Sequence, residues 1–183
     1  MGKKIIQSNI EKYGLIFRLI EPGDAAFILK LRSDPSLARF ISKTSNSLND
    51  QINWINNYKT REAEGKEYYF VTTTLDGQSL GTSRLSELEG DCFELGSWLF
   101  SREAPQGASI LADIVTKEIG FDMLDFNFCK FNVRKENKSV LKYHLNFSPI
   151  IVDENDLDVY FNLSKENFYK NKNKFLKFYS NGN

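Results

Sequence analysis

One histidine occurs in this sequence, within the segment NKSVLKYHLNFSP at 137–149. Its ordinary pKa lies close to neutral pH, so a histidine can give or take a proton with little perturbation. Helical periodicity predicts a short helix here, and at about 100° per residue its apolar residues form one arc. The apolar arc comprises Val140, Leu141, Leu145 and Phe147. His144 lies near the centre of this arc and Tyr143 at its edge, so His144 points inward, either as a core residue or as a group that moves a proton.

A second candidate for proton transfer is Glu94, in the segment CFELGSWLF at 92–100. Alternation predicts a strand in which Glu94 shares one face with several other residues. These residues are Cys92, Gly96, Trp98 and Phe100. A carboxylate among such groups has its pKa raised by desolvation, toward the value that a general base needs. The alternative is a partly exposed glutamate that pairs with a lysine.

A loop of small residues follows this strand and precedes an apolar helix at about 108–123. The loop residues are Gln106, Gly107, Ala108 and Ser109. Such a loop lets the main chain approach a ligand, and the helix N-terminus offers unpaired N–H groups and the positive end of its dipole. Together these suit a phosphate or pyrophosphate, although an ordinary turn has the same composition. Within the helix, Glu118 lies near the centre of the apolar arc, and we interpret it as a packing exception.

The elements around these residues follow an α+β order. Alternation predicts strands at 13–22, 67–75, 78–88, 92–100, 128–135, 149–153 and 157–163. Helical periodicity predicts helices at 24–34, 47–64, about 108–123, within 137–149, and at about 164–180, where lysine is frequent. Asp-Gly at 76–77 and Gly-Asp at 90–91 favour antiparallel hairpins. Because no linker or repeat interrupts this order, we expect one domain over 1–183.

Composition limits the classes of partner and compartment. The 24 basic and 24 acidic side chains cancel, which argues against a nucleic-acid or membrane-surface partner. Two cysteines without metal-ligand spacing and a single histidine predict no metal site. No apolar stretch has the length of a signal-peptide core or a membrane helix. A cytoplasmic protein is therefore expected.

The strand, loop and helix at 92–123, together with NKSVLKYHLNFSP, resemble the GCN5-related N-acetyltransferase (GNAT) family, with coverage of about 13–163. Within that family, ELGSWL and the later VRKENKSVLKYH are most similar to bacterial enzymes that acetylate nucleotide-linked amino sugars. They also resemble the relatives that acetylate protein N-termini. The resemblance implies the GNAT fold, a central mixed and mostly antiparallel sheet flanked by helices. It further implies acetyl-CoA as the donor, with direct transfer to a primary amine in a ternary complex.

The resemblance also implies a set of cofactor-binding residues. The pyrophosphate would bind at the loop and helix start, the pantetheine arm along the strand backbone before it, and the late-motif Asn would contact the cofactor. The residues concerned are Trp98, Leu99, Phe100, Gln106, Gly107, Ala108, Ser109, Ile110 and Asn137.

Catalytic and acceptor-side roles follow from the same resemblance. In many family members the proton donor to the leaving thiolate stands seven residues after the motif's Asn. Counting from Asn137, that position is His144, while Tyr143 is one residue early and is the reserve candidate. Glu94 is the expected base, unless ordered water takes the proton. The segments that shape the acceptor side in relatives carry Trp54, Tyr69 and Arg84 here, although an aromatic residue on a helix face or in a strand is more often part of the core.

Two motifs depart from the family pattern. The loop has Ala104 and Ser109 at the first and last motif places, and Ser148-Pro149 replaces the late Gly-Phe. Three functions remain open: an acetyltransferase for a nucleotide-linked amino sugar in surface-polysaccharide (lipopolysaccharide) biosynthesis, a protein N-terminal acetyltransferase, and a catalytically degenerate CoA-binding module. A small-molecule amine is the expected partner, and a homo-oligomer stays open.

Overall fold

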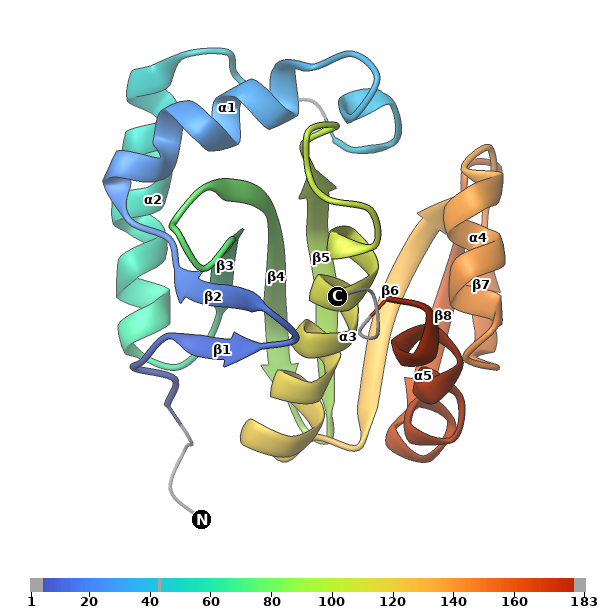
Figure 1. The fold of residues 1–183 in the computed structure, drawn as a ribbon. Coiled ribbons are helices and arrows are strands. Elements are labelled where there is room, and N and C mark those ends of the chain that lie inside the picture. The colour runs from blue at the N-terminus through green and yellow to red at the C-terminus, as the bar shows by residue number, and fades with distance from the viewer. Residues whose placement is uncertain (1–4, 43, 180–183) are drawn as a thin grey trace.

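The computed structural model describes residues 5–42 and 44–179. A single mixed sheet of eight strands, in the order β1-β2-β3-β4-β5-β6-β8-β7, forms its centre (Figure 1). The strands are β1 Ile10–Lys12, β2 Leu15–Leu19, β3 Tyr68–Thr73, β4 Ser79–Glu89, β5 Cys92–Phe100, β6 Phe128–Arg134, β7 Ile150–Glu154 and β8 Asp158–Ser164. Neighbouring strands are antiparallel except for β5 and β6, which are parallel. The predicted α+β class and mostly antiparallel mixed sheet are confirmed.

Helices pack on both faces of this sheet. They are α1 Ala25–Ser33, α2 Leu48–Ala63, α3 Ala108–Glu118, α4 Lys138–Leu145 and α5 Lys165–Tyr179. Successive residues of β3 divide between two cores: Tyr68 and Phe70 face the core that holds α3, α4 and α5, while Tyr69 and Val71 face the core under α1 and α2. The alternation of a strand thus separates two helical layers. Among the residues described, no helix combines the length and apolar character that crossing a membrane requires.

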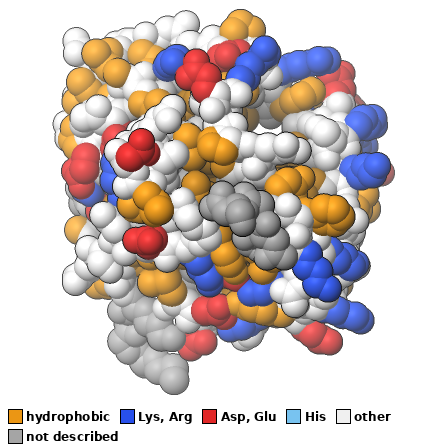
Figure 2. Space-filling view, in the orientation of Figure 1, with side chains coloured by type: hydrophobic (Ala, Val, Ile, Leu, Met, Phe, Trp, Pro, Cys, Tyr) orange, Lys and Arg blue, Asp and Glu red, His pale blue; other side chains and the backbone are white. Residues whose placement is uncertain are grey.

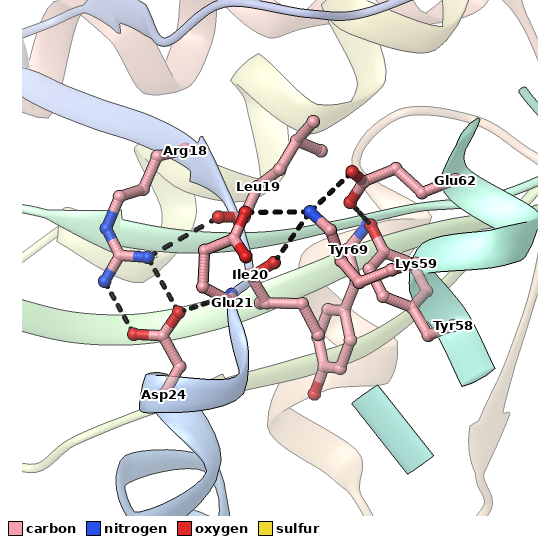
Figure 3. A network of polar contacts seen from close by, with 9 residues as sticks. All are labelled: Arg18, Leu19, Ile20, Glu21, Asp24, Tyr58, Lys59, Glu62 and Tyr69. Carbon is pink, nitrogen blue, oxygen red and sulfur yellow. Dashed lines mark hydrogen bonds and ion pairs between the residues drawn. The ribbon is translucent and has the colours of Figure 1, made fainter. Parts of the chain in front are cut away.

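Polar contacts fix α2 against the sheet (Figure 3). The Tyr58 hydroxyl donates to Glu62 at 2.6 Å and accepts the main-chain N–H of Tyr69 at 2.8 Å. Lys59 forms ion pairs with Glu62 at 2.6 Å and with Glu21, at the end of β2, at 2.8 Å. The Tyr58 hydroxyl thus links α2 to the main chain of Tyr69, a residue of the central strand β3.

Glu118 joins three elements. Its carboxylate is 5% exposed and forms ion pairs with Lys12 of β1 at 2.8 Å and Lys172 of α5 at 2.5 Å. The Tyr13 hydroxyl also donates to it, at 3.1 Å. The residue that looked like a packing exception on its helix is therefore a paired charge that holds β1 and α5 to α3.

Two predicted boundaries differ from the structure. The strand expected at 13–22 is shorter, because Tyr13 and Gly14 adopt positive φ angles of 52° and 74° and form a turn. The turn pairs β2 with the additional strand β1, which the sequence pattern did not predict. The helix expected at about 108–123 ends as α3 at Glu118 and continues as a π-helical turn, Ile119–Met123.

The parallel pair β5–β6 opens along its length. Its register covers three positions, Cys92↔Phe128, Phe93↔Cys129 and Glu94↔Lys130. β5 continues to Phe100 and β6 to Arg134, and the two strands diverge beyond the paired end (Figure 1). The edge of β5 after Glu94 is therefore free of a strand partner on the β6 side.

A β-bulge lies in this unpaired part of β5. The register between β4 and β5 shifts between Thr82↔Leu99 and Arg84↔Gly96, and Ser97 adopts a positive φ of 49°. An extra residue reverses the inward and outward alternation of a strand. Phe93 and Leu95 before the bulge, and Trp98 and Phe100 after it, accordingly pack on the same core. The prediction that Glu94 shares a face with Trp98 and Phe100 is therefore wrong.

Charged side chains of both signs are interspersed over the face shown in Figure 2, and no histidine is visible on it. Among the described residues on this face, basic and acidic side chains alternate instead of forming one basic patch of the kind that binds a polyanionic surface.

Candidate active site

A cavity of about 630 Å³ lies at the opening between β5 and β6. Eight predicted site residues line it: Trp54, Tyr69, Arg84, Glu94, Trp98, Leu99, Asn137 and His144. The cavity thus brings together the expected catalytic histidine, the expected base and the expected acceptor-side residues. Phe100, Tyr143 and the segment 106–110 do not line it.

His144 forms part of the cavity wall and is 4% exposed. Its ring centroid lies 4.4 Å from that of Phe131 and 5.7 Å from that of Trp98. Burial, together with the positive charge of Lys117, lowers the pKa of His144 to about 3, although the negative charge of Asp113 acts in the opposite direction. The imidazole is therefore neutral at pH 7, and its Nδ1 has no hydrogen-bond partner among the described residues. A neutral ring can donate one N–H to an anionic sulfur, but it is a poor general acid.

Tyr143 points into the core instead. Its hydroxyl donates to Asp113 at 2.5 Å, and Asp113 also pairs with Lys117 in a fully buried ion pair on α3. Burial, together with the negative charge of Asp113, raises the pKa of Tyr143 well above its ordinary value. The hydroxyl is thus engaged in a hydrogen bond with a buried carboxylate, and the Tyr143 ring packs against the ring of His144.

The apolar arc predicted for α4 is only partly correct. Phe147 is fully buried and Val140 and Leu141 are half-buried, but Leu145 is 50% exposed. The buried residues of α4 are Tyr143 and His144. The inward direction predicted for His144 is confirmed. The prediction that Leu145 faces the core is wrong, because α4 packs against the core through Tyr143 and His144.

Asn137 begins α4. Its side-chain oxygen accepts the main-chain N–H of Val140 at 3.4 Å and the Ser139 hydroxyl at 3.2 Å. A side-chain cap of this kind satisfies one free donor of the first helical turn. Asn137 therefore fixes the start of α4, and hence His144, while it also lines the cavity.

Glu94 is half-buried at the cavity wall. Burial raises the pKa of its carboxyl, and the negative charge of Glu87 and a hydrogen bond with it raise the pKa further. Arg84 and Lys130 act in the opposite direction. The predicted direction of the shift is confirmed. Glu87 was not foreseen as a partner, because it lies at a register shift of β4 with a positive φ of 48°.

The acceptor-side residues pack against one another. The Trp54 ring stacks on Tyr58 at 5.8 Å, and the guanidiniums of Arg61 and Arg84 lie 5.6 Å from its centroid. Arg84 also forms an ion pair with buried Glu67 at 2.5 Å. Trp54 therefore lines the cavity with a ring whose orientation is fixed by its protein neighbours.

The small-residue loop begins α3 as predicted. Gly107 is the N-cap with a left-handed φ of 84°, and the Ser109 carbonyl accepts the Trp98 indole N–H at 2.9 Å. Within the described residues, no hydrogen bond reaches the main-chain N–H groups of Ser109 and Ile110. The Tyr179 ring at the end of α5 lies directly on Gly107, since a Cβ there would be 2.1 Å from a ring carbon. This contact was not predicted.

The sequence pattern also missed the wall contributed by α1 and the α1–α2 connection. Cavity-lining residues there are Ile28, Arg32, Leu37, Phe40, Ile41, Ser42, Thr44 and Ser45. The connection reaches across the opening, where Arg39 pairs with Glu136 at 3.7 Å and the Arg102 guanidinium donates to Ser36 at 3.0 Å. Irregular segments carry no periodic signal, so sequence patterns could not place them.

These features fit the cofactor that the sequence resemblance implies. The β5 edge after Glu94 offers main-chain groups that no neighbouring strand uses. The N–H groups of Ser109 and Ile110, at a helix start preceded by glycine, suit a pyrophosphate. Ser148 has a φ of 56°, a conformation that favours glycine, so serine occupies the backbone position of the family's Gly.

Comparison with known proteins agrees with this geometry. A structure titled apo FdhC, a nucleotide-linked sugar GNAT, superposes with a TM-score of 0.84 at 32% identity, over 95% of this chain and 99% of that one. The ribosomal-protein-S5-alanine acetyltransferase of Vibrio fischeri gives 0.74 at 15% identity, over 88% and 99% of the two chains. The spermidine N-acetyltransferase of Vibrio cholerae, with CoA and spermine, gives 0.72 at 15%, over 86% and 99%. The last two likenesses concern the fold alone.

A comparison with curated protein sequences gave no match. The family model of the acetyltransferase (GNAT) domain matches residues 14–145, which is more than half of the chain. The protein therefore belongs to the GNAT family of N-acetyltransferases, which use acetyl-CoA as the acetyl donor.

Proposed function

We propose that this enzyme acetylates the primary amine of a nucleotide-linked amino sugar in surface-polysaccharide biosynthesis. The observation that carries the proposal is the cavity at the β5–β6 opening, which is lined by Glu94 of β5, His144 of α4 and three arginines. Its volume of about 630 Å³ is in the range of small-molecule sites. The 32% identical nucleotide-linked sugar GNAT supports the same acceptor class.

The residues of the cavity can divide the chemistry between them. Acetyl-CoA, when bound, supplies a thioester for direct transfer to the amine. Glu94, whose pKa is raised, can accept the proton that an ammonium must lose before it becomes a nucleophile. Neutral His144 can donate a ring N–H to a sulfur anion at the opposite wall. Ser109, Ile110 and the free edge of β5 would hold the cofactor through main-chain groups.

The cavity also bears on the alternatives. A protein N-terminus needs an open groove, whereas the α1–α2 connection here contacts the segments after both β5 and β6, through Arg102–Ser36 and Arg39–Glu136. A degenerate module is suggested by Ala104, Ser109 and Ser148-Pro149, yet the main-chain donors at the helix start do not depend on those side chains. The free thiols of Cys92 and Cys129 suit the reducing cytoplasm, where we place the reaction.

The test is CoA release from acetyl-CoA with a panel of amines. The panel holds nucleoside-diphosphate-linked amino sugars, the free amino sugars, spermidine and a peptide with a free N-terminus. We expect the highest kcat/KM with a nucleotide-linked amino sugar. Preference for the peptide or for spermidine would contradict the proposal, and tight acetyl-CoA binding without turnover of any amine would favour the degenerate module.

A further inference from the structure

Three arginines line the cavity, and two of them are paired with acids. Arg84 forms its ion pair with Glu67 at 2.5 Å, and Arg134 forms one with Asp158 at 3.2 Å. The charges of these two guanidiniums are thus compensated within the protein.

Arg32, in the last turn of α1, is different. Its guanidinium donates to the Thr44 hydroxyl at 3.1 Å and to the Ser42 carbonyl at 3.0 Å, both of them neutral acceptors. Among the described residues, no carboxylate lies within ion-pair distance of it. Asp50, the acid of α2 that lines the cavity, accepts the Ser45 hydroxyl at 2.6 Å instead. Arg32 therefore brings a positive charge to the cavity without a protein anion to balance it.

A half-buried guanidinium that is oriented by neutral oxygens keeps its full positive charge and can bind an external anion. Arginine has five N–H donors in a planar fork, and two of its nitrogens are engaged here. The remaining donors match two oxygens of one phosphate group, a contact that a lysine ammonium cannot reproduce.

The location of Arg32 indicates which ligand would supply that anion. His144 and Asn137 belong to α4 and its start, whereas Arg32 belongs to α1, and all three line one cavity. The helix start that suits the cofactor's pyrophosphate is that of α3, whose residues 106–110 do not line the cavity. An anion at Arg32 would thus belong to the acceptor, with the amine directed toward Glu94.

We propose that Arg32 binds the diphosphate of the acceptor and so makes the enzyme select a nucleotide-linked amino sugar over the free sugar. The inference rests on the proposed function, because it assigns one contact within that same site. The same contact should disfavour polyamines, since an uncompensated cation repels a polycationic acceptor.

The experiment compares Arg32→Gln with Lys30→Gln. Both changes remove a positive charge from the last turn of α1, but Lys30 is exposed and does not line the cavity. The first measurement is the affinity of UDP, dTDP and GDP by calorimetry. We expect the wild type and Lys30→Gln to bind at least one of them equally, and Arg32→Gln to bind it about 10- to 100-fold more weakly. Arg32→Lys, which keeps the charge without the fork, should be intermediate and serves if the glutamine variant does not fold.

The second measurement separates the two sources of phosphate. Arg32→Gln should raise KM for the nucleotide-linked amino sugar alone, leaving KM for the free amino sugar and the affinity for CoA unchanged. A loss of CoA affinity would assign the anion to the cofactor and overturn the inference. Equal nucleotide affinity in all variants, or no nucleotide binding by the wild type, would also overturn it. If the wild type binds the nucleotide but acetylates no nucleotide-linked sugar, the proposed function fails and the role of Arg32 is still decided by the binding data.

Discussion

His144 is enclosed by the rings of Phe131, Trp98 and Tyr143, and this environment sets what the imidazole can do. If its N–H stabilises the leaving sulfur, His144→Phe should lower kcat by about 100-fold, because an oriented donor is lost. Acetyl-CoA affinity should stay unchanged, since phenylalanine fills the same wall. An assay of CoA release measures kcat of the purified variant, and calorimetry measures its affinity for acetyl-CoA. His144→Gln, which retains an N–H donor, should recover part of the rate, whereas wild-type turnover in His144→Phe would make the histidine a core residue.

The same histidine predicts how stability depends on pH. Its folded pKa of about 3 lies below the ordinary value of 6.5, so between these values the unfolded chain binds the proton and the folded protein does not. The contribution of His144 is therefore fully present above pH 6.5 and is lost as pH falls toward 3, by up to about 1.4 kcal/mol per pH unit. Urea unfolding of the wild type and His144→Phe at pH 7, 6, 5 and 4 measures the difference. Parallel pH dependence of the two proteins would show that burial does not suppress the charge.

Glu94 and Glu87 provide a separate test of the base. If Glu94 accepts the proton, Glu94→Gln should lower kcat/KM by about 100-fold. Glu87→Gln removes a neighbouring negative charge that raises the pKa of Glu94, so the acid limb of the pH profile of kcat/KM should move to lower pH. The control is Glu89→Gln, which removes a negative charge from the same strand, because Glu89 is not among the groups that shift the pKa of Glu94. An acid limb that stays in place in Glu87→Gln would indicate that water, or another group, takes the proton.

At the scale of elements, the order of strands and helices could be predicted because each periodicity reports directly on a local conformation. Strand β1 could not, since three residues carry too little alternation. The bulge at Ser97 depends on how β5 pairs with β4, and one extra residue was enough to move Trp98 to the other face. The inward direction of His144 was predicted correctly, because it depends on the periodicity of a single helix and not on how two strands pair.

The end of α5 covers the predicted pyrophosphate loop, and this contact leads to a prediction about the cofactor. If the pyrophosphate binds at the start of α3, the Tyr179 ring over Gly107 would compete with it for the same space. Tyr179→Ala should therefore tighten acetyl-CoA binding by about threefold to tenfold, the equivalent of one lost ring contact. Phe178→Ala, at a neighbouring side chain that is 81% exposed, is the matched control.

Gly107→Val should weaken acetyl-CoA with or without the Tyr179 change, because a branched residue is strained at a φ of 84°. Weaker binding in Tyr179→Ala would instead make the tyrosine part of the cofactor site. Unchanged affinity in Gly107→Val would place the pyrophosphate elsewhere.

At the scale of the whole molecule, the sheet consists of two parts that share three residue pairs between β5 and β6. The cavity lies where these parts diverge, and across its mouth the largely exposed pair Arg39–Glu136 adds little stability. The two walls of the site are thus joined at one end and separate at the other, where the cavity lies. Helix α1 and the α1–α2 connection supply the third wall, and Arg32 of α1 became visible as a site residue only once the fold placed that helix end at the cavity.

A ligand that bridges the two parts should protect their facing segments from hydrogen exchange. Saturating acetyl-CoA at about 100 times its Kd would stabilise the folded state by about 2.7 kcal/mol. Beyond this uniform gain, the proposed site predicts that amides at 97–100 in β5, at 132–137 and in the first turn of α3 slow most, because those segments would face the bound ligand. Strands β1 to β3 should show the uniform part alone, measured by mass spectrometry with and without ligand. Extra protection centred on β1 to β3 would mean that acetyl-CoA binds away from the β5–β6 opening, and the division of the sheet would then have no part in cofactor binding.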